Sequence, residues 1–175
     1  MYNKHVILDA FASFVSQYDG LAVLIVAEIF ADAAYVQELR SQAVKFGIAD
    51  NIRYVSEIAF ADMPSYYALA DATISIPISD GLPLTIFESL ACGSFLILGN
   101  LPQYVGLIEK ALTGKFVALD DSQVLADVMT WVASQEDLRS RVVENGKRVL
   151  SKFADKKEQS RRVNEIYTDL IAVSS

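Results

Sequence analysis

The feature that most constrains the fold is a regular alternation of short apolar runs and helical segments. "LAVLIVA", at residues 21–27, is a continuous apolar run, as expected of a strand that is covered on both faces. Further strand-like runs lie at residues 51–56, 72–77, 95–99 and 115–119. Segments with helical character separate them, at residues 33–46, 63–69, 83–92 and 103–110. This alternation predicts an α/β fold with a doubly wound parallel sheet of at least five strands.

Helices are predicted at both ends of the chain. Residues 7–18 carry apolar side chains at helical spacing, and Asp19-Gly20 ends that segment. After Asp121 the sequence is helical throughout, at residues 122–133, 135–152 and 155–171. A chain of 175 residues is long enough for one domain with a sizeable core. We therefore expect a single domain over residues 1–175, completed by C-terminal helices.

Composition and charge exclude some classes of protein. The chain is 53% hydrophobic and 21% charged, which is typical of a compact globular protein. A net charge of −7 argues against nucleic acid as a partner. Residues 139–175 nevertheless hold nine of the 15 basic residues. The simplest interpretation is a solvated face on the last helices, and the alternative is a surface that meets anionic lipid or another domain.

The sequence also suggests a compartment. Its longest apolar run, residues 21–27, is far too short to span a bilayer, and the N-terminus lacks a signal-peptide pattern. Cys92 is the single cysteine and cannot form an internal disulfide. We therefore expect a cytoplasmic protein.

The stretch "SDGLPLTIFESLACG", at residues 79–93, combines features that suit an anion site. Pro83 fits the first position of a helix, and Gly81 lets the backbone come close to a ligand. The first N–H groups of that helix have no partner within it, so they favour a bound phosphate. These groups belong to Leu84, Thr85 and Ile86.

Two carboxylates flank this helix start. Asp80 precedes it, and Glu88 lies within the helix among apolar residues, where an unpaired carboxylate would cost several kcal/mol. One interpretation makes Asp80 an ordinary helix cap and Glu88 an exposed residue. The other makes both part of a site for a ligand that mixes phosphate with hydroxyl groups, such as a nucleotide-sugar.

The same stretch resembles the donor-binding signature of retaining GT-B glycosyltransferases of the family-four type (glycosyl transferases group 1). That signature runs as Glu-Gly, a short apolar pair, and a helix whose Glu lies eight positions after the first, followed by Ala-Cys-Gly. The rest of the chain resembles the family in order and spacing, through "ILDAFASF", "LAVLIVAE", "NIRYVSEI", "MPSYYALADATISIPISDG" and the closing helices. The resemblance implies one half of a GT-B fold, a Rossmann-like domain that binds a nucleotide-sugar.

The resemblance also implies roles for particular residues. Asp80, with Gly81 and Leu82, would face the donor sugar, and Glu88 would accept hydrogen bonds from the ribose. The backbone of Leu84 and Thr85 would approach the diphosphate. Three residues would line the base pocket, and they are Val55, Ser56 and Glu57. Tyr66 and Tyr67 are expected to pack their short helix.

Three departures from the family stand out. Asp80 replaces the usual Glu and is one methylene shorter. The Gly-rich turn that usually follows the strand "LAVLIVA" is absent, and Gly106 stands where the family often has a Glu. Lys4 is a weak match for an upstream Lys of the family that neutralises the diphosphate.

The resemblance implies a hexosyltransferase that acts with retention on a carbohydrate or lipid-linked acceptor, without a cofactor or metal. We expect this chain to be a fragment, inactive alone, that lacks the N-terminal acceptor domain, the first strand of its own domain and a complete catalytic set. Peripheral contact with the inner face of the membrane fits such an acceptor. The alternatives are another GT-B enzyme on nucleotide-sugars, such as an inverting transferase or an epimerase, and a non-catalytic module that binds a nucleotide or a protein.

Overall fold

A computed structural model describes residues 2–28, 32–108 and 112–173. Strands and helices alternate along it, as the sequence pattern predicts. The strands are β1 (Leu24–Ala27), β2 (Ile52–Val55), β3 (Ala72–Ser75), β4 (Phe95–Gly99) and β5 (Gly114–Val117). The helices are α1 (Lys4–Val15), α2 (Ala33–Lys45), α3 (Met63–Leu69), α4 (Leu84–Ala91), α5 (Ser122–Ala133), α6 (Leu138–Phe153) and α7 (Lys156–Val173). Short 3-10 helices span Ala49–Asn51 and Pro102–Tyr104.

The strands form two hydrogen-bonded sets. β1 pairs in parallel with β2, and β4 lies between β3 and β5 with both pairings parallel. The predicted α/β class and the five parallel strands are confirmed, but the described strands divide into a pair and a triplet because β1 and β3 are not paired with each other. Residues 2–4 lie between the ends of the two sets. Tyr2 forms an isolated bridge with Pro77 after β3, and the Lys4 ammonium donates to the carbonyl of Ala27 in β1.

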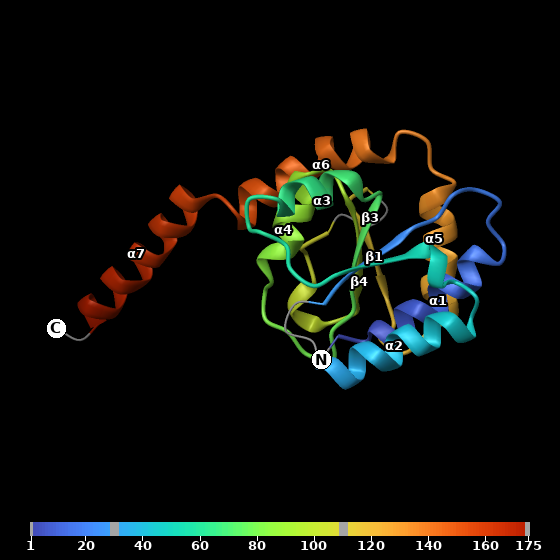
Figure 1. Ribbon diagram of the computed structural model, residues 1–175. Coiled ribbons are helices and arrows are strands. Elements are labelled where there is room, and N and C mark those ends of the chain that lie inside the picture. The colour runs from blue at the N-terminus through green and yellow to red at the C-terminus, as the bar shows by residue number, and fades with distance from the viewer. Residues whose placement is uncertain (1, 29–31, 109–111, 174–175) are drawn as a thin grey trace.

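Helices cover both faces of the strands (Figure 1). On one face α1 packs against α2 and α5, and on the other α4 packs against α3 and α6. β4 lies between these layers, and its residues 95–98 have no exposed surface at all. Burial on both faces explains why this strand reads as a continuous apolar run rather than as an alternating one.

One predicted helix is not formed. Residues 103–108 do not continue as an α-helix after the 3-10 turn Pro102–Tyr104, and residues 109 and 110 lie outside the described part. Val105, which caps the turn, is extended with ψ 125°, and Gly106 after it has a φ of +87°, a left-handed conformation that cannot continue an α-helix. A glutamate would be strained there, so the departure from the family at this position has a local backbone cause.

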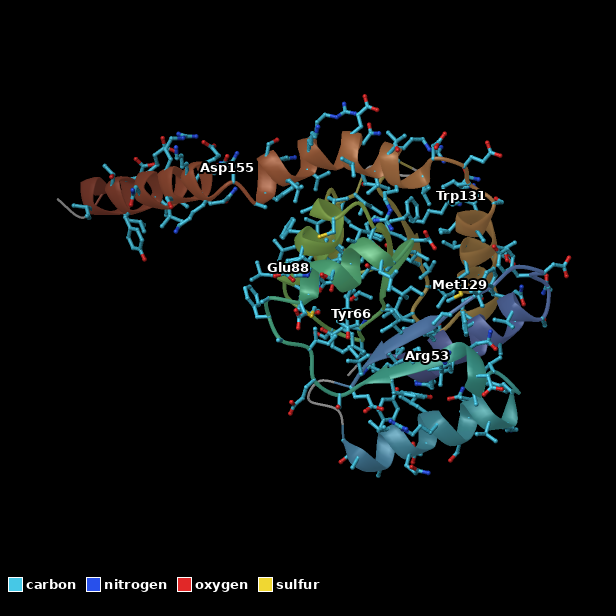
Figure 2. The ribbon with its side chains drawn as sticks, turned by 45° about the horizontal axis from the view of Figure 1, so that its top comes forward. Arg53, Tyr66, Glu88, Met129, Trp131 and Asp155 are labelled. Atoms are coloured by element: carbon cyan, nitrogen blue, oxygen red, sulfur yellow. The ribbon has the colours of Figure 1, made fainter. Side chains whose placement is uncertain are left out.

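The last helix, α7, projects away from the body of the domain (Figure 1). Asp155 marks its base in Figure 2, and its carboxylate accepts the N–H of Glu158 at 2.9 Å. Apolar side chains recur along α7 at helical spacing and are exposed, at Val163, Ile166, Tyr167, Leu170 and Ile171. In the part of the chain described, no helix is both long and apolar enough to cross a membrane.

Candidate functional site

The candidate site lies where strands end and connect to the next helix. In open parallel sheets, ligands bind in the crevice beyond the carboxyl ends of the strands. The segment between β3 and α4 carries Asp80, Gly81 and Leu82, and α4 carries Leu84, Thr85 and Glu88. Val55 ends β2, and Ser56 and Glu57 follow it directly. Residues 2–4 pass between the carboxyl ends of β1 and β3.

The start of α4 has no side-chain cap. Pro83 is its N-cap, with extended backbone angles of φ −72° and ψ 134°, so the helix begins one residue later than predicted. The carbonyl of Pro83 accepts the N–H of Ile86 at 3.2 Å, so that group is not available to a ligand as the sequence suggested. No acceptor within the described residues is recorded for the N–H of Leu84 or of Thr85. The start of this helix therefore presents two N–H groups that a ligand could accept from.

Asp80 does not cap α4 and instead lies in a cluster of polar groups. Its Oδ1 accepts the N–H of Gly81 at 2.8 Å, and its Oδ2 accepts the hydroxyl of Tyr2 at 3.2 Å. The side-chain amide of Gln103 donates to its carbonyl. Tyr104 is fully buried, and burial raises its pKa, as does the charge of the nearby Asp80 carboxylate. The side chain of Asp80 is thus held on more than one side.

Glu88 is half-buried on α4 and faces α3. The hydroxyl of Tyr67 donates to its Oε2 at 3.5 Å, and burial followed by the charge of Glu88 raises the pKa of Tyr67 to about 12. Figure 2 labels Glu88 and, on α3, Tyr66, the neighbour of Tyr67. Tyr67 does pack its helix, being only 8% exposed. No sequence pattern pointed to its contact with Glu88, because the two residues are 21 positions apart on different helices.

The end of β2 has exposed polar side chains beside a hollow. Ser56 and Glu57 are exposed, and with Ile58 and Ala59 they line an open hollow of about 340 Å³. The carbonyl of Val55 already accepts the N–H of Glu28 at 2.9 Å. The carbonyl of Val55 is thus already hydrogen-bonded, and the exposed polar residues beside the hollow are Ser56 and Glu57.

Basic side chains contact residues at the end of β1. Lys4 is the first residue of α1, and the pKa of its ammonium is lowered overall, because burial lowers it more than the charge of Glu28 raises it. Glu28 is ion-paired with Arg40 at 2.8 Å. Within the described residues, no group of three His, Cys, Asp or Glu side chains could hold a metal.

A comparison with protein families identifies the class. The profile described as "Glycosyl transferases group 1" matches residues 1–149. This chain belongs to that family. The match covers the strands, α4 and the whole candidate site.

Curated relatives of the chain carry the names of enzymes that make glycosylated lipids. The chain is 30% identical to the alpha-monoglucosyldiacylglycerol synthase of Streptococcus pneumoniae over 115 residues, which is 65% of this chain and 25% of that protein. It is 24% identical to the phosphatidyl-myo-inositol mannosyltransferase of Mycobacterium leprae over 149 residues, or 85% of this chain and 38% of that protein. The chain thus spans well under half of the curated relatives it matches.

Solved structures show the same fold. Anabaena Alr3699/HepE in complex with UDP and glucose matches with a TM-score of 0.82 at 19% identity, over 95% of this chain and 45% of that one. The C-terminal domain of the group 1 family protein LpcC from Francisella tularensis matches with a TM-score of 0.73 at 19% identity, over 87% of this chain and 80% of that one. The fold of this glycosyl transferase group 1 chain is therefore that of one GT-B domain.

Proposed function

We propose that this chain binds the nucleotide-sugar donor of a retaining hexosyltransferase that acts on a carbohydrate or lipid-linked acceptor. The observation that carries the proposal is the uncapped start of α4, with Asp80 shortly before the helix and Glu88 within it. The N–H groups of Leu84 and Thr85 suit a diphosphate because the helix dipole favours negative charge there. Carboxylates suit the hydroxyl groups of the sugar and of the ribose because they accept hydrogen bonds strongly.

The other assigned residues extend the same site. Gly81 and Leu82 are exposed beside Asp80, where the donor sugar would lie, and Ser56 and Glu57 border the hollow proposed for the base. Lys4 lies at the same edge of the strands and is the described cation best placed to meet the diphosphate. UDP is the natural nucleotide to try first, since solved relatives are complexes with UDP, with UDP-glucose, and with UDP and glucose.

We propose that a longer protein completes the active site. The chain covers 45% of HepE and at most 39% of its curated relatives, so more than half of their length has no counterpart here. In a doubly wound sheet with strand order 3-2-1-4-5-6, β2 and β1 would be strands 3 and 2, and β3, β4 and β5 would be strands 4, 5 and 6. The first strand then belongs between β1 and β3, where the described strands are not paired with each other.

The exposed stripe of α7 fits the same proposal. Val163, Ile166 and Tyr167 are each about half exposed or more, at 49%, 59% and 63%. We assign this stripe to the proposed N-terminal domain rather than to lipid. Arg161 and Arg162 form ion pairs with Glu158 within the helix, which leaves less positive charge to attract an anionic membrane. We also propose that the complete enzyme needs no metal or cofactor. It would act in the cytoplasm, near the inner face of the membrane.

Binding measurements with this chain test the donor site directly. NMR titrations with UDP and UDP-glucose should show weak, saturable shifts, weak because the proposed partner domain and its cations are absent. Glu88→Ala should weaken both ligands about tenfold or more, because a hydrogen bond to a charged group contributes about 1.5–3 kcal/mol. Glu38→Ala, which removes an exposed carboxylate on α2, is the matched control and should bind as the wild type does.

Two results would count against the proposal. Binding of neither ligand by the wild-type chain would exclude an autonomous donor site. Binding that survives the combined Asp80→Ala and Glu88→Ala substitutions would place the ligand elsewhere and favour a non-catalytic nucleotide-binding module. In the longer protein, the anomer of the product measured by NMR separates retention from inversion, and activity in the presence of a chelator tests the absence of a metal.

A further inference from the structure

We infer that Tyr67, a buried tyrosine outside residues 79–93, orients the Glu88 carboxylate of that stretch. The inference rests on the proposed function, because it assigns this carboxylate to the ribose. It goes further in naming a residue that belongs to neither the signature nor the ligand contacts. Tyr67 is a positioning residue, since it would act through the carboxylate.

The contact between Tyr67 and Glu88 joins two helices whose relative position is fixed. Tyr67 is 8% exposed, and its hydroxyl lies 3.5 Å from Oε2 of Glu88, at the long end of the hydrogen-bond range. The guanidinium of Arg139 on α6 donates to the carbonyl of Ala70 at 3.0 Å and to that of Cys92 at 3.1 Å. These carbonyls belong to the C-cap residues of α3 and α4, so one side chain is hydrogen-bonded to the C-terminal ends of both helices.

A tyrosine donor determines how the Glu88 carboxylate can be used. The terminal torsion of a glutamate is broad and has no strong staggered preference, so an unheld carboxylate samples many orientations. A hydroxyl that donates to Oε2 restricts that rotation and leaves Oε1 to accept from a ligand. Tyr67 remains a proton donor throughout the physiological range, because its hydroxyl loses its proton only at high pH. Glu88 is then held ready before the ribose arrives.

The test measures UDP affinity by protein-observed NMR on this chain. Tyr67→Phe should weaken UDP and UDP-glucose alike by about threefold to tenfold, because both ligands carry the ribose. In a Glu88→Ala background the same substitution should have no further effect, since the residue through which Tyr67 acts is gone. Tyr66→Phe, on the same helix, is the matched control and should leave both affinities unchanged.

The outcomes distinguish a failure of the proposed donor site from a failure of the role of Tyr67. If the wild-type chain binds neither ligand, the proposed donor site fails, and the positioning role fails with it. If the wild type binds and Tyr67→Phe costs the same affinity with or without Glu88, Tyr67 supports the fold rather than the carboxylate, and the inference is overturned.

Discussion

The hydroxyl of Tyr67 on α3 lies 3.5 Å from Oε2 of Glu88 on α4, and burial together with this carboxylate raises the pKa of Tyr67 to about 12. An unfolded tyrosine titrates near pH 10. The folded chain therefore binds this proton more tightly than the unfolded chain does between about pH 10 and 12. The contact makes the fold sensitive to alkali.

Stability should consequently fall as the pH rises above 10. The stabilisation linked to Tyr67 is fully present below the pKa of the unfolded state and is lost as the pH approaches the folded value. Urea denaturation at pH 8, 10 and 11 measures the free energy of unfolding. Tyr67→Phe should reduce the slope above pH 10, while Tyr66→Phe should leave it unchanged. An identical slope in Tyr67→Phe and wild type would mean that other tyrosines account for the alkaline loss.

Arg139 should contribute more to stability than a surface cation does. Its guanidinium donates to the carbonyls of Ala70 and Cys92, at the ends of α3 and α4. Arg139→Ala should lower the free energy of unfolding by about 1–3 kcal/mol, because two partly buried carbonyls lose a charged donor. Lys147→Ala, exposed on the same helix, should stay within about 0.5 kcal/mol of the wild type. Equal effects would show that the two carbonyls are satisfied by water.

Gly93 should tolerate a side chain less well than Gly47. Both have positive φ, of +80° and +70°, so alanine at either position costs about 1–2 kcal/mol in backbone strain. A Cβ on Gly93 would also lie 2.8 Å from Cγ2 of Val143, whereas a Cβ on Gly47 would meet nothing within 4 Å. Chemical denaturation of Gly93→Ala and Gly47→Ala should therefore show the larger loss for Gly93→Ala. A larger loss for Gly47→Ala would contradict the packing of α6 against the end of α4.

The stripe on α7 should be dispensable for the stability of this chain. Val163 and Ile166 are exposed, so Val163→Asp and Ile166→Asp should change the free energy of unfolding by no more than about 0.5 kcal/mol. In the longer protein, the same substitutions should lower thermal stability if the stripe packs against the proposed N-terminal domain.

Lipid is the competing occupant of that stripe. Sedimentation with vesicles that contain anionic phospholipid tests it, and we expect the chain to remain in the supernatant. Vesicle binding that is abolished by Ile166→Asp would assign the stripe to a membrane surface instead.

Local patterns along the chain were sufficient to predict most of the secondary structure. Continuous apolar runs predicted buried parallel strands, and α3, β4 and α5 have the predicted bounds. Pro83 and Gly93 limit α4 to within a residue at each end, because proline and glycine act on the backbone locally. The two acids of residues 79–93 were also recognisable, since their spacing along one helix start is a property of sequence alone.

The surroundings of those acids were decided by tertiary structure. Tyr67 reaches Glu88 across 21 residues, Tyr2 reaches Asp80 across 78, and Arg139 reaches Ala70 across 69. No periodicity or propensity encodes such contacts, because they depend on how separate helices and strands pack. The same reason explains the division of the strands into two sets, which no local pattern signals. Residues near the site could thus be named from the sequence, whereas the groups that hold them required the fold.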